Sequence, residues 1–152
     1  MNNSDLKKEL HARCAAFVRQ RMTDARQAMD AAQESANLEE KSSAGDKYET
    51  GRAMAQIARD QAARQLDEAL KLKNALDQIN PTKSSARAGL GSLVITDQNR
   101  FYISISAGKL TIDEKEYFVV SPQSPIGKLI INCRPNDVIT FNKQKQAILY
   151  VY

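Results

Sequence analysis

The first proline of the chain is Pro81, and this position divides the sequence into two parts of different character. Before it, alanine, arginine, glutamine and glutamate predominate, and all four are favourable in helices. From Leu93 onward, β-branched and aromatic residues occur in short runs separated by turns, as in LVIT, RFYISIS and EYFVVS. We therefore expect an α+β protein with a helical region over residues 1–80, a linker over 81–90 and a β-rich domain over 91–152.

Apolar residues in the first part recur every three or four positions, as they do on one face of a helix. The first stripe consists of Leu10, Cys14, Phe17, Val18, Met22, Ala25, Met29, Ala32 and Ala36, and the second of Met54, Ile57, Ala58, Ala62, Leu66, Ala69, Leu72, Leu76 and Ile79. A lone helix cannot bury such a stripe, but two stripes of similar length can cover each other. The pattern predicts an antiparallel helical hairpin with its tip near residues 42–50. A dimerising coiled coil uses the same kind of stripe and is the alternative.

The charge of the chain is unevenly distributed. Residues 1–80 contain 13 basic and 13 acidic residues, whereas residues 81–152 contain 9 and 5, so the second part carries the whole net charge of +4. A basic surplus favours association with nucleic acid, including DNA, or with an acidic surface. A surplus of this size is usually only a solvated surface.

Several classes of protein are disfavoured by the sequence. The opening residues MNNSDLKKEL are charged where a signal peptide is apolar, and no apolar run approaches the roughly 20 residues of a membrane span. The two cysteines, Cys14 and Cys133, are too few for a disulfide framework or a four-ligand zinc site. We expect a cytoplasmic protein without membrane association, in which both cysteines are small apolar packing residues.

Two carboxylates, those of Asp46 and Glu49, stand three residues apart at the predicted bend, directly after Gly45. In this spacing they can form a capping box, in which Asp46 accepts a hydrogen bond from the N3 amide and Glu49 reaches back to the N-cap amide. Two carboxylates within one helical turn can also share a divalent cation. They supply only two ligands, so Mg²⁺ would need others from water or a partner. The pattern leaves both roles open: a helix cap, or part of a metal site that another macromolecule completes.

The order of these features resembles that of the Gre factors, the bacterial transcript-cleavage factors, over nearly the whole chain. Members of this family carry G-D-x-x-E at the tip of a helical hairpin, which corresponds here to Gly45, Asp46 and Glu49. Their second domain contains S-P-[IL]-G-x-x-[IL] and then a G-D-x-[IV] turn. Here these read SPIGKLI at 124–130 and NDVI at 136–139. Asparagine replaces the glycine of the turn, and asparagine tolerates a left-handed conformation.

The resemblance implies that the second domain has an FKBP-like fold, a strongly bent antiparallel sheet with a short helix in the segment SPIGKLII. It implies that this domain docks at the rim of the secondary channel of RNA polymerase and that the hairpin reaches towards the active centre. Asp46 and Glu49 would help to hold the second Mg²⁺ and a water there, so that the polymerase itself cleaves backtracked RNA. The chain would then be no enzyme. It would act as a monomer, bind no cofactor stably, and have RNA polymerase and the nascent RNA 3′ end as partners.

Contact residues and alternative functions follow from the same resemblance. Tyr48 and Arg52 would contact RNA near the tip. The residues that would contact the polymerase are Ile126, Lys128 and Arg134. The arginines of the helices, which could touch RNA phosphates or pair with helix acids, are Arg13, Arg19, Arg21, Arg26, Arg52, Arg59 and Arg64. Because Lys47 and Tyr48 replace small polar residues common at the tip, one alternative is a channel-binding regulator without cleavage activity. An FKBP-like chaperone or prolyl isomerase and a coiled-coil scaffold are further alternatives.

Overall fold

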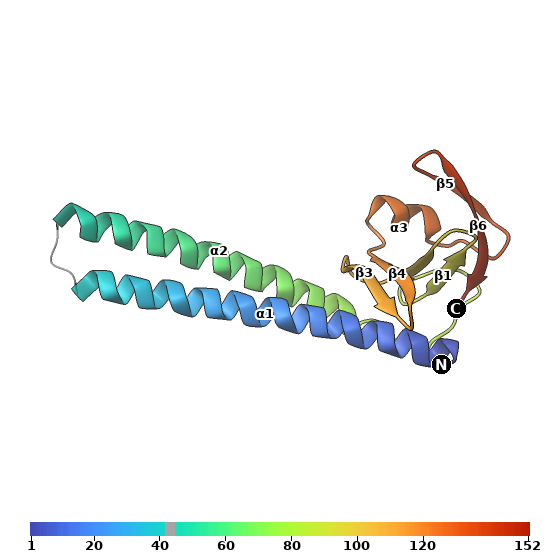
Figure 1. The fold of residues 1–152 in the computed structure, drawn as a ribbon, viewed down its shortest axis with the longest axis horizontal. Helices are drawn as coiled ribbons and strands as arrows, with labels where there is room; N and C mark the ends of the chain where they lie inside the picture. Colours follow the sequence, from blue (N-terminus) through green and yellow to red (C-terminus); the bar gives the residue numbers. More distant parts are fainter. Residues whose placement is uncertain (42–44) are drawn as a thin grey trace. The chain divides into compact units, whose positions relative to one another are not determined.

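The computed structural model describes the backbone of residues 1–41 and 45–152 and the side chains of residues 1–38 and 50–152. In this described part, two long helices precede a six-stranded sheet, and a short third helix lies between the fourth and fifth strands (Figure 1). The helices are α1 (Asn3–Lys41), α2 (Gly45–Asp77) and α3 (Pro125–Ile130). The strands are β1 (Leu93–Thr96), β2 (Arg100–Ile103), β3 (Gly108–Ile112), β4 (Lys115–Val120), β5 (Val138–Phe141) and β6 (Gln144–Val151). The expected α+β class is confirmed.

The chain folds into two compact units. The first comprises Met1–Ala15 and Asn74–Tyr152, and the second comprises Ala16–Lys73. The boundary therefore does not coincide with the change in composition at Pro81, because residues at one end of each long helix belong to the unit that contains the sheet. Of the helices that the structure describes, none combines the length and the apolar character needed to cross a lipid bilayer.

In the unit Ala16–Lys73, α1 and α2 pack through a seam of small residues. The buried residues of this seam recur every seven positions: Val18, Ala25 and Ala32 on α1, and Ala55, Ala62 and Ala69 on α2. A seven-residue repeat is typical of the contact line between two coiled helices. The predicted apolar stripe of the second helix is wrong for its first residues, because the side chains of Met54 and Ile57 are 67% and 57% exposed. Ala55 is buried in their place, since it stands seven residues before Ala62.

The sheet has the strand order β3-β4-β2-β1-β6-β5. All neighbouring strands are antiparallel except β2 and β4, which are parallel, with Phe101 opposite Phe118. The antiparallel sheet that the resemblance implied is therefore corrected to a mixed sheet. The parallel pair arises because the chain leaves β2, forms the β3–β4 hairpin at the edge, and returns with β4 beside β2.

The core of the sheet unit lies between one face of the sheet and α3. It contains Val94, Phe101, Ile103, Ile139 and Ile148 from the strands and Ile126 and Ile130 from α3, together with Ala88. Ala88 is held on both sides, because its amide donates to the Cys133 carbonyl (2.8 Å) and its carbonyl accepts from the Asn132 amide (2.7 Å). The end of the expected linker is thus a packed part of this unit.

Candidate functional site

The motif G-D-x-x-E occupies the first turns of α2, because this helix begins at Gly45. Asp46 therefore lies inside the helix rather than at the N-cap position. In a first turn a carboxylate is still stabilised by the positive end of the helix dipole. The side chains of Asp46, Tyr48 and Glu49 lie outside the described residues, and so do their expected capping, metal and RNA contacts.

The turns of α2 that follow the motif expose an apolar surface. Met54 and Ile57 stand three residues apart, so they are neighbours on one side of the helix, and both are largely exposed. Arg52 is exposed on the preceding turn. Sequence reasoning missed this surface because it assigned Met54 and Ile57 to the seam. The seven-residue spacing of Ala55, Ala62 and Ala69 was the signal that could have revealed it.

Two of the arginines expected either to contact RNA or to pair locally have partners on their own helix. The Arg13 guanidinium contacts the Glu9 carboxylate at 2.9 Å, one helical turn away. The Arg21 guanidinium lies 4.6 Å from the centroid of the Phe17 ring. The Arg13 contact supports pairing with a helix acid, whereas the partner of Arg21 is an aromatic ring of the same helix.

The segment SPIGKLI forms α3, and its start is fixed by local hydrogen bonds. Ser124 is the N-cap: its hydroxyl accepts from the Gly127 amide (3.0 Å) and donates to the Ser121 carbonyl (2.7 Å). Pro125 occupies the first helical turn, where its missing N–H costs no hydrogen bond. A Cβ atom at Gly127 would lie within 1.9 Å of the Ser121 carbonyl oxygen, so only glycine fits. The sequence motif is therefore a structural unit in which serine, proline and glycine have separate roles.

The expected polymerase-contacting residues differ in exposure. Lys128 is exposed on α3, and Arg134 is exposed in the segment that follows, where its amide donates to the Asp137 carboxylate at 2.8 Å. Ile126 is 8% exposed and belongs to the core. Leu129 of the same helix is 40% exposed. Of these four residues, Lys128, Leu129 and Arg134 therefore have exposed side chains.

The NDVI turn is preserved without glycine. Asn136 has a φ of 78°, in the left-handed region that asparagine tolerates. Its amide donates to the Ile148 carbonyl at 2.8 Å, and the Ile148 amide donates to the Asp137 carbonyl at 2.8 Å. Asparagine therefore serves here in the position of the expected glycine.

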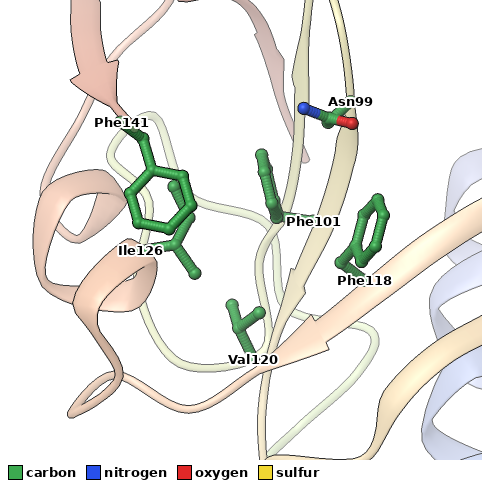
Figure 2. Close-up of a pocket in the computed structure, with 6 residues that line it drawn as sticks. All are labelled: Asn99, Phe101, Phe118, Val120, Ile126 and Phe141. Carbon is green, nitrogen blue, oxygen red and sulfur yellow. The ribbon is translucent and has the colours of Figure 1, made fainter. Parts of the chain in front are cut away.

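An apolar pocket of about 180 Å³ opens between α3 and the sheet (Figure 2). Its lining residues are Asn99, Phe101, Phe118, Val120, Ile126 and Phe141. They come from β2 and the turn before it, from β4, from α3 and from β5. Sequence reasoning did not identify this pocket, because no single segment contributes more than two of its residues.

On the other side of the sheet, a group of polar side chains is buried against the start of α1. The Cys14 thiol lies close to Tyr102 and Ser104, and the Tyr102 hydroxyl has no hydrogen-bond partner among the described residues. Burial raises the pKa of Cys14 to about 11, although the nearby Ser104 hydroxyl opposes the shift. Burial also raises the pKa of Tyr102. Cys14 is fully buried, which agrees with the expected role of a small apolar packing residue.

Two further groups of this region have pKa values shifted by burial. The Lys7 ammonium donates to the Lys83 carbonyl at 2.7 Å, and its burial lowers its pKa. Burial lowers the pKa of His11 more than the neighbouring Asp77 carboxylate raises it. His11 is therefore favoured in its neutral form within the folded unit.

Where side chains are described, no three histidine, cysteine, aspartate or glutamate residues gather as they would around a metal ion. No protein-family model matches the chain, and a search of curated proteins finds no match.

Proposed function

We propose that this chain is a transcription elongation factor that binds bacterial RNA polymerase through its secondary channel and stimulates cleavage of backtracked RNA by the polymerase. The observation that carries the proposal is the position of G-D-x-x-E at the start of α2, where two long helices meet. Two carboxylates within one turn supply only part of a Mg²⁺ site, so a pair at this position suits a hairpin that delivers them to a partner with the remaining ligands.

The dimensions of the hairpin support this role. α2 contains 33 residues, which corresponds to roughly 50 Å at about 1.5 Å per residue. The seam is made mostly of alanine, and alanine allows the two helices to approach closely. The result is a long, slender element suited to a narrow channel.

The chemistry assigned to the tip follows from phosphoryl transfer with two metal ions. Such a centre needs carboxylates that hold a metal ion and favour loss of a proton from the attacking water. Asp46 and Glu49 would supply carboxylates, and the polymerase the remaining ligands and the RNA. Tyr48 and Arg52 would contact the RNA, and Mg²⁺ would be shared with the polymerase rather than bound stably by this chain.

The second domain would anchor the hairpin. We assign it an FKBP-like fold, on the basis of a sheet that packs on a short helix with the SPIGKLI motif. Lys128 and Arg134 are exposed beside this helix, and basic side chains suit an acidic docking surface. Ile126 would act from the core of the same region, by fixing the position of α3.

The tip assignment is tested with a backtracked complex of bacterial RNA polymerase. Asp46→Asn with Glu49→Gln should abolish stimulated RNA cleavage and leave polymerase binding nearly unchanged. The matched control is Asp30→Asn with Glu34→Gln, which removes the same charge from an exposed part of α1 and should leave cleavage intact. Full cleavage by the tip variant would reject the metal role. Binding without cleavage by the natural chain would indicate the channel-binding regulator, and absence of binding would refute both functions.

The docking assignment is tested by charge reversal. Lys128→Glu with Arg134→Glu should weaken binding to the polymerase and reduce its dependence on salt, because rim charges act mainly through long-range attraction. Lys83→Glu with Lys115→Glu makes the same change in net charge at two other exposed positions and should have little effect. Equal affinity of the two double variants would place the docking surface elsewhere.

A further inference from the structure

We propose that the face of the sheet turned away from α3 binds single-stranded RNA, with the Tyr150 and Tyr152 rings as a stacking platform for an unpaired base and the Arg100 guanidinium as a contact for the phosphate backbone. This inference goes beyond the proposed function, since it requires neither the tip of the hairpin nor the polymerase.

The register of the strands places Tyr150 and Arg100 on this face. Successive residues of a strand point to opposite faces, and residues opposite each other on neighbouring strands share a face. Val94 lies in the core beside α3, so Ile95, the next residue, points to the other face. Ile95 is opposite Arg100 on β2 and opposite Tyr150 on β6. These three residues therefore form a row across three strands, with its ends about 10 Å apart at about 4.8 Å per strand.

Tyr150 and Tyr152 form an aromatic stack at one end of the row. Their ring centroids lie 5.7 Å apart, and the ring planes are inclined by only 10°. Tyr150 is 53% exposed, whereas Tyr152 is half-buried. The backbone of Tyr152 exchanges two hydrogen bonds with Leu93, of 2.9 and 3.0 Å, so this end of β6 is held in the sheet. Because the two rings already hold each other in place, a base can stack on Tyr150 at a small cost in side-chain freedom.

Arg100 supplies a cation at the other end of the row. Its guanidinium lies 6.0 Å from the centroid of the buried Tyr117 ring, and its side chain is partly exposed. Among the residues that the structure describes, no carboxylate forms an ion pair with Arg100. Lys115 stands two residues before Tyr117 on β4, so it lies on the same face, and it is exposed. This face therefore offers two basic side chains in addition to the tyrosines.

The sheet unit carries the whole net charge of the chain. Its segments Met1–Ala15 and Asn74–Tyr152 contain 12 basic and 8 acidic residues, whereas Ala16–Lys73 contains 10 of each. Acids do occur in the turns beside the row. The Asp97 carboxylate accepts from the Ala147 amide at 3.0 Å, and the Asp113 carboxylate lies near Tyr117. The surplus of basic residues nevertheless favours a polyanion as the ligand of this unit.

The combination of an exposed ring with a cation selects a polyanion that has unpaired bases. Every base has a π-face that can stack on an aromatic side chain, and basic side chains attract the phosphates between the bases. Single-stranded RNA presents both groups, and a sheet face with aromatic side chains is a common way of binding it. A duplex presents its phosphates but keeps the faces of its bases inside the stack, so it can satisfy only the charge.

The probe is a short fluorescein-labelled single-stranded RNA of mixed sequence, and fluorescence anisotropy at low salt measures its binding to the full-length chain. Tyr150→Ala should weaken binding about tenfold, the order expected for the loss of one stacked base. Tyr150→Phe should keep the affinity, because it keeps the ring. Val138→Ala is the matched control, since it shortens another exposed apolar side chain, on β5, and should leave binding unchanged.

The salt dependence of binding tests the role of Arg100. For single strands, each neutralised phosphate contributes about 0.7 to the slope of log affinity against log salt concentration. Arg100→Gln should therefore reduce the slope by about that amount. Lys109→Gln removes the same charge from an exposed residue on the other face, opposite Phe118, and should leave the slope unchanged. Equal slopes for the two variants would refute the contact between Arg100 and the backbone.

The amide spectrum of the isotope-labelled natural chain decides the matter if a variant does not fold. Addition of the RNA should shift the signals of Ile95, Arg100 and Tyr150. Shifts confined to α1 and α2 would place the RNA on the hairpin and overturn the proposal. So would absence of binding, tighter binding of duplex RNA or of single-stranded DNA of the same sequence, or full affinity of Tyr150→Ala. A dimer in light scattering that Tyr150→Ala dissociates would also overturn it, because the stacked tyrosines would then be an interface between two copies of the chain.

Discussion

Gly127→Ala is the substitution for which the structure makes the sharpest prediction about stability. A Cβ atom at this position would lie 1.9 Å from the Ser121 carbonyl oxygen and 2.8 Å from the Ser124 hydroxyl oxygen. The same carbonyl accepts from the Ser124 hydroxyl (2.7 Å) and from the Ser124 amide (3.1 Å). The added methyl group can be accommodated only if the start of α3 moves away from the 121–124 turn, and this movement breaks the helix cap.

The expected loss has two parts. Removal of a serine N-cap interaction costs about 0.5–2 kcal/mol. Forcing a methyl group into packed surroundings costs typically about 1–3 kcal/mol. Together they predict that the free energy of unfolding of the sheet unit falls by roughly 1.5–5 kcal/mol. Gly89→Ala is the matched control, since a Cβ atom there would have no other atom within 4 Å. Its effect should stay within about 0.5 kcal/mol.

Urea denaturation followed by tyrosine fluorescence measures this difference. The chain has no tryptophan and five tyrosines, of which Tyr102, Tyr117, Tyr150 and Tyr152 lie in the sheet unit, so the signal reports mainly on that unit. The midpoint for Gly127→Ala should be far below that of the natural chain, while the midpoint for Gly89→Ala should be close to it. Similar midpoints for the two alanine variants would show that the 121–124 turn yields to the methyl group, and the close-packing argument would be wrong.

Two further predictions concern α1 and the seam. Because burial lowers the pKa of His11, the unfolded chain binds more protons than the folded one at mildly acidic pH. This contribution to stability is complete above the unfolded pKa of about 6.5 and is lost as the pH falls below it, so the urea midpoint should drop from pH 7.5 to pH 5.5. His11→Gln should make the drop smaller, and an equal drop in that variant would assign the pH dependence to other groups. In the seam, Ala62→Leu should lower the stability of the hairpin by about 1–3 kcal/mol, as measured by circular dichroism during denaturation, because Ala62 is buried between the helices. Met54→Ala should change it by no more than about 0.5 kcal/mol, and a larger loss for Met54→Ala would return that residue to the seam.

The two long helices could be predicted from sequence because their signals are local. Helix-forming residues without proline extend to Pro81, and the observed helices α1 and α2 run over most of that region. The stripe of the second helix was only partly predictable. Methionine and isoleucine are stronger apolar signals than alanine, so Met54 and Ile57 outweighed Ala55 in the pattern. In the folded hairpin the seven-residue spacing decides which residue is buried.

In the sheet unit too, features set by residues close together in sequence could be predicted, and features set by distant residues could not. The start of α3 was predictable, because Ser124, Pro125 and Gly127 act within one helical turn. The parallel pairing of β2 with β4 was not, because it depends on where the β3–β4 hairpin docks. The pocket was not predictable either. Phe118 and Phe141 stand 23 residues apart in sequence, and only the folded sheet brings them to one cavity (Figure 2).

The alanine seam gives a physical reason why the hairpin would need a partner: it stabilises the two helices only weakly. An alanine side chain removes little apolar surface from water, so Ala25, Ala32, Ala55 and Ala62 contribute little hydrophobic stabilisation for the length of helix that they hold together. Larger seam residues would stabilise the hairpin more, but they would also separate the helices and widen it. A slender hairpin that exposes Met54 and Ile57 near its acidic end retains apolar surface for another molecule to cover. The composition of the seam is therefore better suited to insertion into a narrow site than to a self-sufficient helical domain, and this is the same physical requirement that the proposed channel-binding function makes.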